Sequence, residues 1–190
     1  MAPAPPKVAG QRMQYALKFS TGLLILLTLV GCATSSGTVK NASPVSLAKP
    51  LSLDFILVET SSSLGELKTE KHRVNDAIIS GLNETGLFTQ VSANQSDAGD
   101  ANGIKVHANI VEIREVSDNA RSWVGGWAGR ARILVQVTVS DLKSGAPVET
   151  FEAEGQSGGS AKSGTTDEAI QEAASQIVAE VVKINSQTSQ

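Results

Sequence analysis

Residues 130–142 read RARILVQVTVSDL, the clearest strand pattern in the chain. The positions between the apolar ones are mostly polar, and this period of two is typical of a β-strand with one buried face. The turn-like segment DLKSGA (141–146) and a second strand pattern, PVETFEAEGQ (147–156), follow at once, so we predict a β-hairpin. The residues expected to point into the core are Ala131, Ile133, Val135, Val137 and Val139.

Working outward, residues 104–116 alternate and then shift phase between Val111 and Ile113, which predicts a long strand with a β-bulge. Residues 92–103 (SANQSDAGDANG) read as a polar loop with nothing to bury. We expect a short strand over 87–91, after a left-handed helix cap at Gly86. A further strand is predicted over 51–59 (LSLDFILVE).

Two amphipathic helices complete the pattern. The first is expected over 64–83, after a serine-rich break at 61–63 that could cap it, with Leu67, Val74, Ile78 and Leu82 on one stripe. The second is expected from Thr165, which forms a capping box with Glu168, to about Ile184. Its alanine-rich apolar face permits close packing on a sheet; this face is Ile170, Ala173, Ala174, Ile177, Val178, Val181 and Val182.

The element order is therefore β-α-β-β-β-β-α. This order predicts an α+β two-layer sandwich, with a mostly antiparallel sheet and both helices packed on one face. The length of 190 residues fits a single domain, which we place at 51–186, followed by a disordered tail at 187–190. A net charge of -3 argues against a nucleic-acid partner.

The amino-terminal segment has the features of an export signal. Lys7, Arg12 and Lys18 are the only charged residues before Cys32. Residues 21–30 (TGLLILLTLV) form an uncharged run of about 10 residues, about half of what a helix needs to span a bilayer. We predict a signal peptide over 1–31, with translation starting at Met1 or Met13.

Cys32 is the only cysteine, so it is a free thiol, an intermolecular bridge or a modification site. Its place directly after the apolar run favours modification over a structural cysteine buried in a core helix. The segment Leu29-Val30-Gly31-Cys32 resembles the lipobox of bacterial lipoproteins.

That resemblance implies cleavage before Cys32, a diacylglycerol thioether on its sulfur and an acyl chain such as palmitate on the new amino terminus. It implies no other cofactor. Ala33 in place of Asp implies the outer membrane, with the domain facing the periplasm, over the inner membrane. Small, polar and proline residues then predict a flexible tether over 32–50.

Residues 119–132 (NARSWVGGWAGRAR) hold both tryptophans of the chain. One interpretation is a glycine-rich connection whose indoles fold over the sheet edge. A second is a contact site for a partner or ligand, formed by Arg121, Trp123, Trp127 and Arg130, because Trp and Arg are enriched at interface hot spots. A third is insertion into a membrane surface, where Trp is also enriched. The glycines precede a strand, so they do not form a phosphate loop.

A second resemblance, to the bacterial lipoproteins of domain of unknown function 4410, extends over most of the chain after Leu51. It implies a cell-envelope lipoprotein and no activity. The matching residues are Gly86-Leu87-Phe88 with Val91, Gly126 to Arg130, Val135 to Val139, Asp141, Gly145, Gly158-Gly159 and Ala169 to Val182.

Catalytic and metal-binding groups are scarce. His72 and His107 are isolated in the sequence, and no serine lies in a G-x-S-x-G motif. We therefore predict no metal and no catalytic residue. The function expected is a non-enzymatic envelope lipoprotein that binds another envelope component or serves as an accessory subunit of an assembly or transport complex. The alternatives are a periplasmic small-ligand or glycan binder, less readily a hydrolase, and a structural lipoprotein without a fixed partner.

Overall fold

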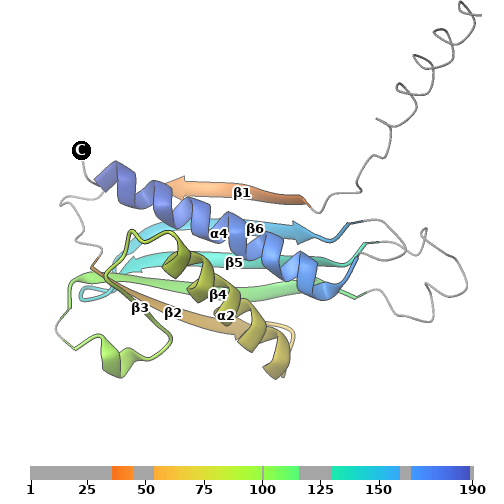
Figure 1. Ribbon diagram of the computed structural model, residues 1–190, viewed down its shortest axis with the longest axis horizontal. Helices are drawn as coiled ribbons and strands as arrows, with labels where there is room; N and C mark the ends of the chain where they lie inside the picture. The colour runs from red at the N-terminus through yellow and green to blue at the C-terminus, as the bar shows by residue number, and fades with distance from the viewer. Residues whose placement is uncertain (1–35, 45–53, 100, 116–129, 159–163, 189–190) are drawn as a thin grey trace, which may run out of the picture. The chain divides into compact units, whose positions relative to one another are not determined.

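The strands and helices follow the predicted order, with one strand added at the start (Figure 1). The computed structural model describes residues 36–44, 54–99, 101–115, 130–158 and 164–188, all within the compact unit Thr34–Gln190. The elements are β1 (Ser36–Pro44), β2 (Phe55–Ser62), α2 (Lys68–Glu84), β3 (Gln90–Ser92), the short 3-10 helix η2 (Gln95–Asp97), β4 (Gly103–Arg114), β5 (Arg132–Asp141), β6 (Pro147–Gln156) and α4 (Thr166–Thr188).

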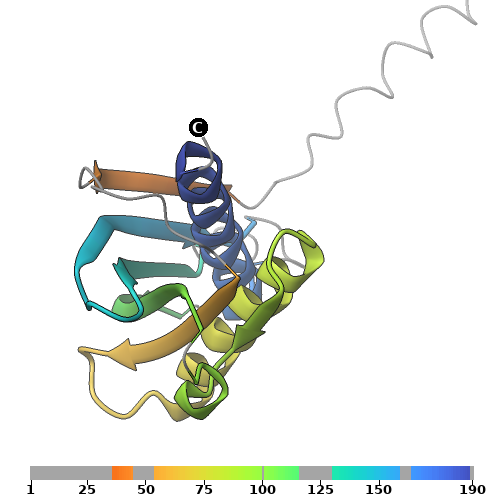
Figure 2. The same cartoon turned by 90° about the vertical axis from the view of Figure 1, so that its left-hand side faces the viewer.

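The six strands form one sheet in the order β1-β6-β5-β4-β2-β3. The pairs β1–β6, β5–β6 and β4–β5 are antiparallel, whereas β2 pairs in parallel with both β3 and β4. Both helices lie on the same face of the sheet (Figure 2). The predicted α+β two-layer fold is therefore confirmed.

The predicted hairpin forms the centre of the core. All five positions expected to point inward, Ala131 and four on β5, are fully buried. On β6, Gly155 lies directly under α4, where an added Cβ would collide with the backbone of Ala169 and come within 2.6 Å of the Ala173 nitrogen. Glycine and alanine thus let the helix approach the sheet closely, as the alanine-rich pattern indicated.

Several smaller predictions are also confirmed. The register of the β4–β5 pair shifts between Ile110 and Glu112, where the bulge was expected. Gly86 takes a φ of 64°, in the left-handed region, just after α2. The Glu168 amide donates to the Thr165 hydroxyl, 3.1 Å away. The Glu168 carboxylate, however, accepts from the amide of Gly164, one residue earlier than a regular capping box requires.

The first core strand begins later than predicted. It spans Phe55–Ser62 instead of 51–59, of which residues 51–53 lie outside the described part of the chain. Ser61 and Ser62 therefore belong to the strand and do not cap the helix. The first helix begins at Lys68, after Leu67 and without a side-chain cap. The serines extend the strand because pairing with β4 continues through them, up to the hydrogen bond from the Ser63 amide to the Ile110 carbonyl.

The prediction that residues 92–103 bury nothing is wrong at Ala98, which is only 8 % exposed. Ala98 packs with Phe55 and Leu57 in a small second apolar cluster. Ile56 and Val58, between those residues on β2, join the main core under the helices. Because β2 carries apolar side chains on both faces, the segment around η2 must cover the face that the helices leave open.

The flexible tether predicted over 32–50 is wrong for Ser36–Pro44, which forms β1 and pairs with β6 from Ser36↔Gln156 to Pro44↔Glu149. The domain therefore extends well before the predicted boundary at Leu51. The physical reason is that β6 would otherwise be an edge strand with unpaired backbone groups, which a short polar segment can satisfy. At the other terminus, α4 continues to Thr188, so the tail predicted at 187–190 is wrong for its first two residues.

Candidate functional site

The residues predicted to carry function fall largely outside the described ranges. Cys32, Arg121, Trp123 and Trp127 are not among the described residues. Arg130 is described, and it is exposed just before the buried Ala131 at the entry to β5. Nothing in the described part of the chain therefore tests these contacts directly.

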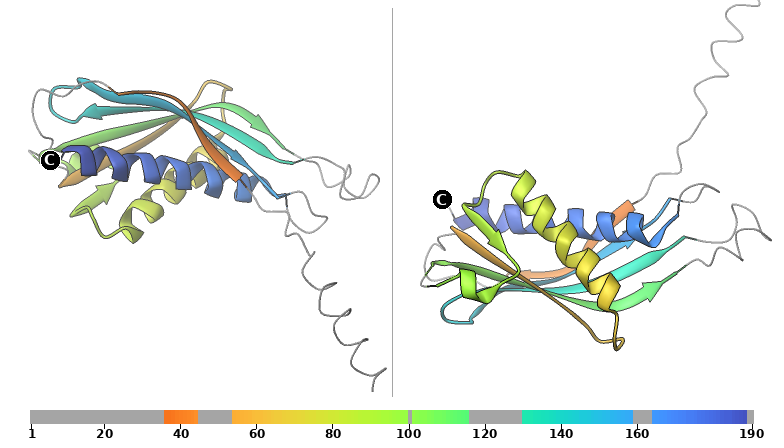
Figure 3. Two further views of the ribbon diagram at one scale, coloured as in Figure 1. Left: turned by 90° about the horizontal axis from the view of Figure 1, so that it is seen from above. Right: turned by 60° about the horizontal axis from the view of Figure 1, so that its bottom comes forward.

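The strand register nevertheless brings the flanks of these predicted sites together. Ser36 pairs with Gln156, Gln156 with Arg132, and Arg132 with Arg114. These four residues form one row across the sheet, which we call the Ser36 end. There β1 and β5 begin and β4 and β6 end, as Figures 1 and 3 show.

The Ser36 end is continuous in sequence with both predicted functional segments. Cys32 lies four residues before Ser36 in the chain. The connection that carries Trp123 and Trp127 leaves the sheet after Arg114 and returns to it at Arg132. The predicted lipid-attachment site and the predicted contact residues therefore join the described domain at the same end.

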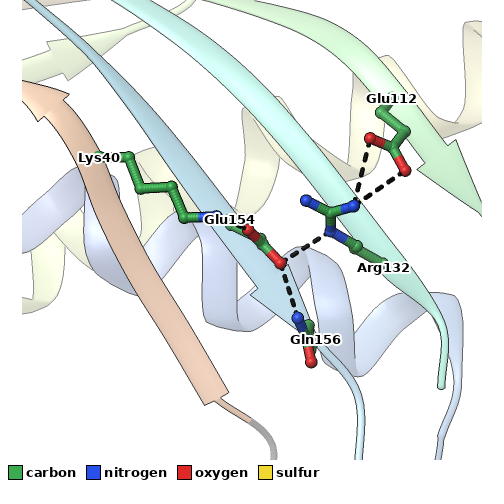
Figure 4. Close-up of polar contacts among 5 residues, drawn as sticks. All are labelled: Lys40, Glu112, Arg132, Glu154 and Gln156. Atoms are coloured by element: carbon green, nitrogen blue, oxygen red, sulfur yellow. Dashed lines mark hydrogen bonds and ion pairs between the residues drawn. The ribbon is translucent and has the colours of Figure 1, made fainter.

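An ionic network crosses four strands next to this end (Figure 4). Arg132 donates from Nε to Glu154, 2.7 Å away, and from Nη1 to Glu112, 3.2 Å away. Gln156 donates to Glu154 over 2.6 Å. Lys40 of β1 forms an ion pair with the same carboxylate. One glutamate thus connects β1, β6 and β5, and Arg132 extends the connection to β4.

Glu154 is 4 % exposed, which is unusual for a carboxylate that lies on the sheet face away from the helices. Hydrogen bonds from Arg132 and from Lys40 lower its pKa to about 2, against an ordinary value of 4.5. In the same contact, the hydrogen bond to Glu154 raises the pKa of Arg132. The network therefore stays ionised at neutral pH and holds the edge strand to the sheet.

The chain that leaves β6 is also fixed at the Ser36 end. The amide of the buried Ser157 donates to the carbonyl of Ala131, 2.9 Å away, and its hydroxyl accepts from the Ala131 amide, 2.8 Å away. The Glu168 carboxylate accepts from the amides of Gly158 and Gly164, so it holds both flanks of the connection between β6 and α4. Sequence reasoning missed this role of Ser157, since a serine in a glycine-rich stretch carries no such signal.

His107 is not isolated in the structure. Its Nε2 lies 3.0 Å from the Ser61 hydroxyl, across the β2–β4 pair. Ser61 donates its own proton to the Asn109 side chain, 3.0 Å away, so the imidazole donates to the serine and does not accept its proton. A serine nucleophile needs the opposite arrangement. Within the described ranges, no group of three His, Cys, Asp or Glu side chains could hold a metal ion.

A pair of neighbouring carboxylates lies on the helix side of the sheet. Glu149 of β6 and Glu180 of α4 are 3 % and 8 % exposed. Burial first, and then the neighbouring Glu180, raise the pKa of Glu149. Lys183 is paired with Glu180, and this contact raises the pKa of the lysine. These contacts join α4 to the sheet, away from the Ser36 end.

Two grooves formed by described residues lie between the helices. One groove of ≈ 460 Å³ runs along α2 and α4, and the ion pair of Arg73 and Asp167, 2.9 Å long, forms part of its lining. A neighbouring groove of ≈ 270 Å³ is lined mainly by small and polar residues. Three charged groups line the larger groove: Arg73 and Asp167 pair with each other, and Asp76 pairs with His72, 3.3 Å away. They therefore do not converge on a ligand, as a small-molecule site would require.

Comparison with known proteins gives a family and a set of similar folds. PelC from Paraburkholderia phytofirmans, crystallised as a dodecamer, is similar with a TM-score of 0.47 and 16 % identity, over 78 % of this chain and 96 % of that one. A DUF330 protein from Xanthomonas campestris has a TM-score of 0.46 and 13 % identity, over 80 % and 96 % of the two chains. No curated protein matches.

No helix among the described residues is both long enough and apolar enough to span a membrane. The family model described as "Domain of unknown function (DUF4410)" matches residues 33–183, which is most of the chain. The chain therefore belongs to the DUF4410 family.

Proposed function

We propose that this protein is a lipid-anchored, non-enzymatic component of the bacterial cell envelope. The observation that carries the proposal is the lipobox-like segment Leu29-Val30-Gly31-Cys32 at the end of a short apolar run. The family match begins at residue 33, directly after that cysteine. The predicted cleavage site, before Cys32, thus lies one residue before the start of the family match.

The chemistry needs the Cys32 thiol as the nucleophile for a diacylglycerol group. Each buried methylene contributes about 0.8 kcal/mol, and a single acyl chain anchors only marginally, so two or three chains are needed for stable attachment. With Ala33 as the second residue of the mature protein, we place the anchor in the outer membrane, with the domain on its periplasmic side.

A non-enzymatic role is supported by the arrangement of the polar groups described above. Ser61 directs its proton away from His107. Glu154 is fully engaged by a lysine, an arginine and a glutamine, which serves strand pairing and leaves no free carboxylate there for acid–base chemistry. The family description assigns no activity.

The contact with another envelope component is proposed at the connection between β4 and β5, through Arg121, Trp123, Trp127 and Arg130. Trp and Arg contribute strongly to interfaces, and the flanking glycines permit close backbone approach. The β4–β5 pair, which continues beyond its bulge to Arg114↔Arg132, supplies a rigid base for this connection.

The anchor is tested by mass spectrometry of the membrane fraction of cells that express the full chain. We expect an amino-terminal peptide that begins at Cys32 and carries the mass of a diacylglycerol group plus an acyl chain. The Cys32→Ser variant should lose the modification and leave the membrane fraction. An uncleaved chain with an unmodified Cys32 would refute the proposal.

The contact is tested by crosslinking in cells. A photoreactive amino acid at Trp123 or Trp127 should trap an envelope component, whereas the same group at Lys143, in the turn between β5 and β6, should not. Equal trapping at all three positions would show that the connection has no special role.

A further inference from the structure

We infer that the Ser36 end of the domain faces the bilayer that holds Cys32, and that this lipid surface is the envelope component it contacts. The inference rests on the proposed lipid anchor. It follows from the presence of β1, which the sequence pattern did not reveal.

The first step is the length of chain between anchor and domain. Only residues 33–35 separate Cys32 from Ser36, the first residue of β1. An extended chain spans at most about 3.6 Å per residue, so the Cα atoms of Cys32 and Ser36 are within roughly 14 Å. The predicted tether of about 18 residues would have allowed roughly 60 Å. The domain is therefore held at the lipid surface and cannot stand away from it.

The second step is that Ser36 cannot move away from the sheet on its own. It belongs to an antiparallel ladder with β6 that is continuous from Ser36↔Gln156 to Lys40↔Glu152. Val39 packs against the main core, and Lys40 is ion-paired with the nearly buried Glu154. Freeing β1 to lengthen the linker would break all of these contacts.

The third step is the direction of the sheet relative to the anchor. The residue of the domain nearest to Cys32 in the chain is Ser36, which lies at one end of the sheet, so the other end of the sheet is farther from the anchor. The opposite end of the hairpin, the turn that contains exposed Lys143, is separated from the Ser36 end by the ten residues of β5. At about 3.3 Å per residue this is roughly 33 Å. The two ends therefore lie at very different distances from the point of attachment.

The chemistry of the Ser36 end fits a lipid surface. Arg114 and Arg130 are exposed there, as is Glu115, and basic side chains are attracted to anionic headgroups. Together with the short linker to Cys32, the two arginines favour lipid over a protein partner at this end.

The test uses the fact that acylation consumes the only cysteine. The variants Arg114→Cys and Lys143→Cys each replace one exposed basic side chain, at opposite ends of the sheet, and leave one free thiol in the mature protein. Each acylated variant is labelled with an environment-sensitive fluorophore. It is then reconstituted in vesicles of phosphatidylethanolamine and phosphatidylglycerol that contain a lipid with a spin-labelled headgroup.

We expect the label at position 114 to be quenched several-fold more strongly than the label at position 143. Equal quenching would overturn the inference. So would a label at 114 that is shielded from a water-soluble quencher but not quenched by the lipid, because a second protein molecule would then cover this end. A flexible insertion of about 15 residues after Ala33 should bring the two labels close to equality; an unchanged difference would overturn the role of the short linker.

Mass spectrometry of the same samples tests the lipid anchor separately from the orientation of the domain. An unmodified Cys32 refutes the anchor itself and, with it, the inference. An acylated Cys32 combined with equal quenching refutes only the orientation.

Discussion

The β5–β6 hairpin and the edge strand β1 belong to the same sheet but are held in it by different forces. The hairpin has strands on both sides and the helix α4 above it, and its inward positions are fully buried. Strand β1 pairs only with β6, and most of its residues are small or polar. Apolar burial stabilises the first region, whereas backbone pairing and one ionic network stabilise the second.

The difference shows that the strand nearest the proposed anchor depends on the hairpin and not the reverse. Strand β1 is kept in place by its backbone pairing with β6, by the ion pair of Lys40 with Glu154 and by Val39, which packs against the main core. Conditions that weaken these contacts should release β1 and lengthen the linker while the hairpin stays folded.

The largest effect is expected from matched glycine substitutions in the two regions. Gly155→Ala places a Cβ against the backbone of α4, which cannot move without separating from the sheet. The free energy of unfolding should therefore fall by about 3 kcal/mol or more. Gly37→Ala meets only the side chain of Gln176, which can rotate, so its cost should stay below about 1 kcal/mol. Thermal and denaturant unfolding measure both. Similar losses for the two variants would mean that hairpin and edge strand contribute alike.

A medium effect is expected from neutralising the carboxylate that joins the two regions. Glu154→Gln removes the charge that Lys40 and Arg132 share, and should cost about 2 kcal/mol. Glu112→Gln serves as the control, because Glu112 is 45 % exposed and contacts only Arg132 in this network, so its cost should be within about 1 kcal/mol. Hydrogen exchange should show faster exchange of the β1 amides in the first variant only. An unchanged β1 would contradict the assigned role of Glu154.

The smallest effect is expected from acid. The pKa of Glu154 is lowered from 4.5 to about 2 in the folded protein, so its contribution to stability is present above pH 4.5 and is lost as the pH falls toward 2. At pH 4 we expect a loss of about 1 kcal/mol relative to neutral pH, seen first as exchange of the β1 amides. The Glu154→Gln variant should lack this part of the acid response. If the wild-type protein and the Glu154→Gln variant lose the same stability on acidification, titration of Glu154 does not contribute to acid unfolding.

Much of the fold could be predicted because its signals are local. The period-two pattern of β5, the turn before β6 and the alanine-rich face of α4 each depend on neighbours within a few residues. The phase shift in β4 likewise marked its bulge. The predicted fold class is confirmed for this reason, although the boundaries of β2 and α2 were placed several residues early.

The candidate site was harder to predict because its parts are far apart in sequence. Lys40 and Glu154 are separated by 114 positions, and Ser61 and His107 by 46. No local pattern links such pairs; only the strand order places them on neighbouring strands. Whether a buried glutamate is ionised likewise depends on partners that the sequence does not identify.

By itself, the sequence determined the hairpin, the two amphipathic helices and the short apolar run that ends at a single cysteine, because periodicity and hydrophobic length act over adjacent residues. Only the tertiary structure decided that residues 36–44 are a strand and not a tether. That choice depends on an unpaired edge of β6 more than 100 residues later in the chain, whose backbone groups a polar segment of almost any composition can satisfy.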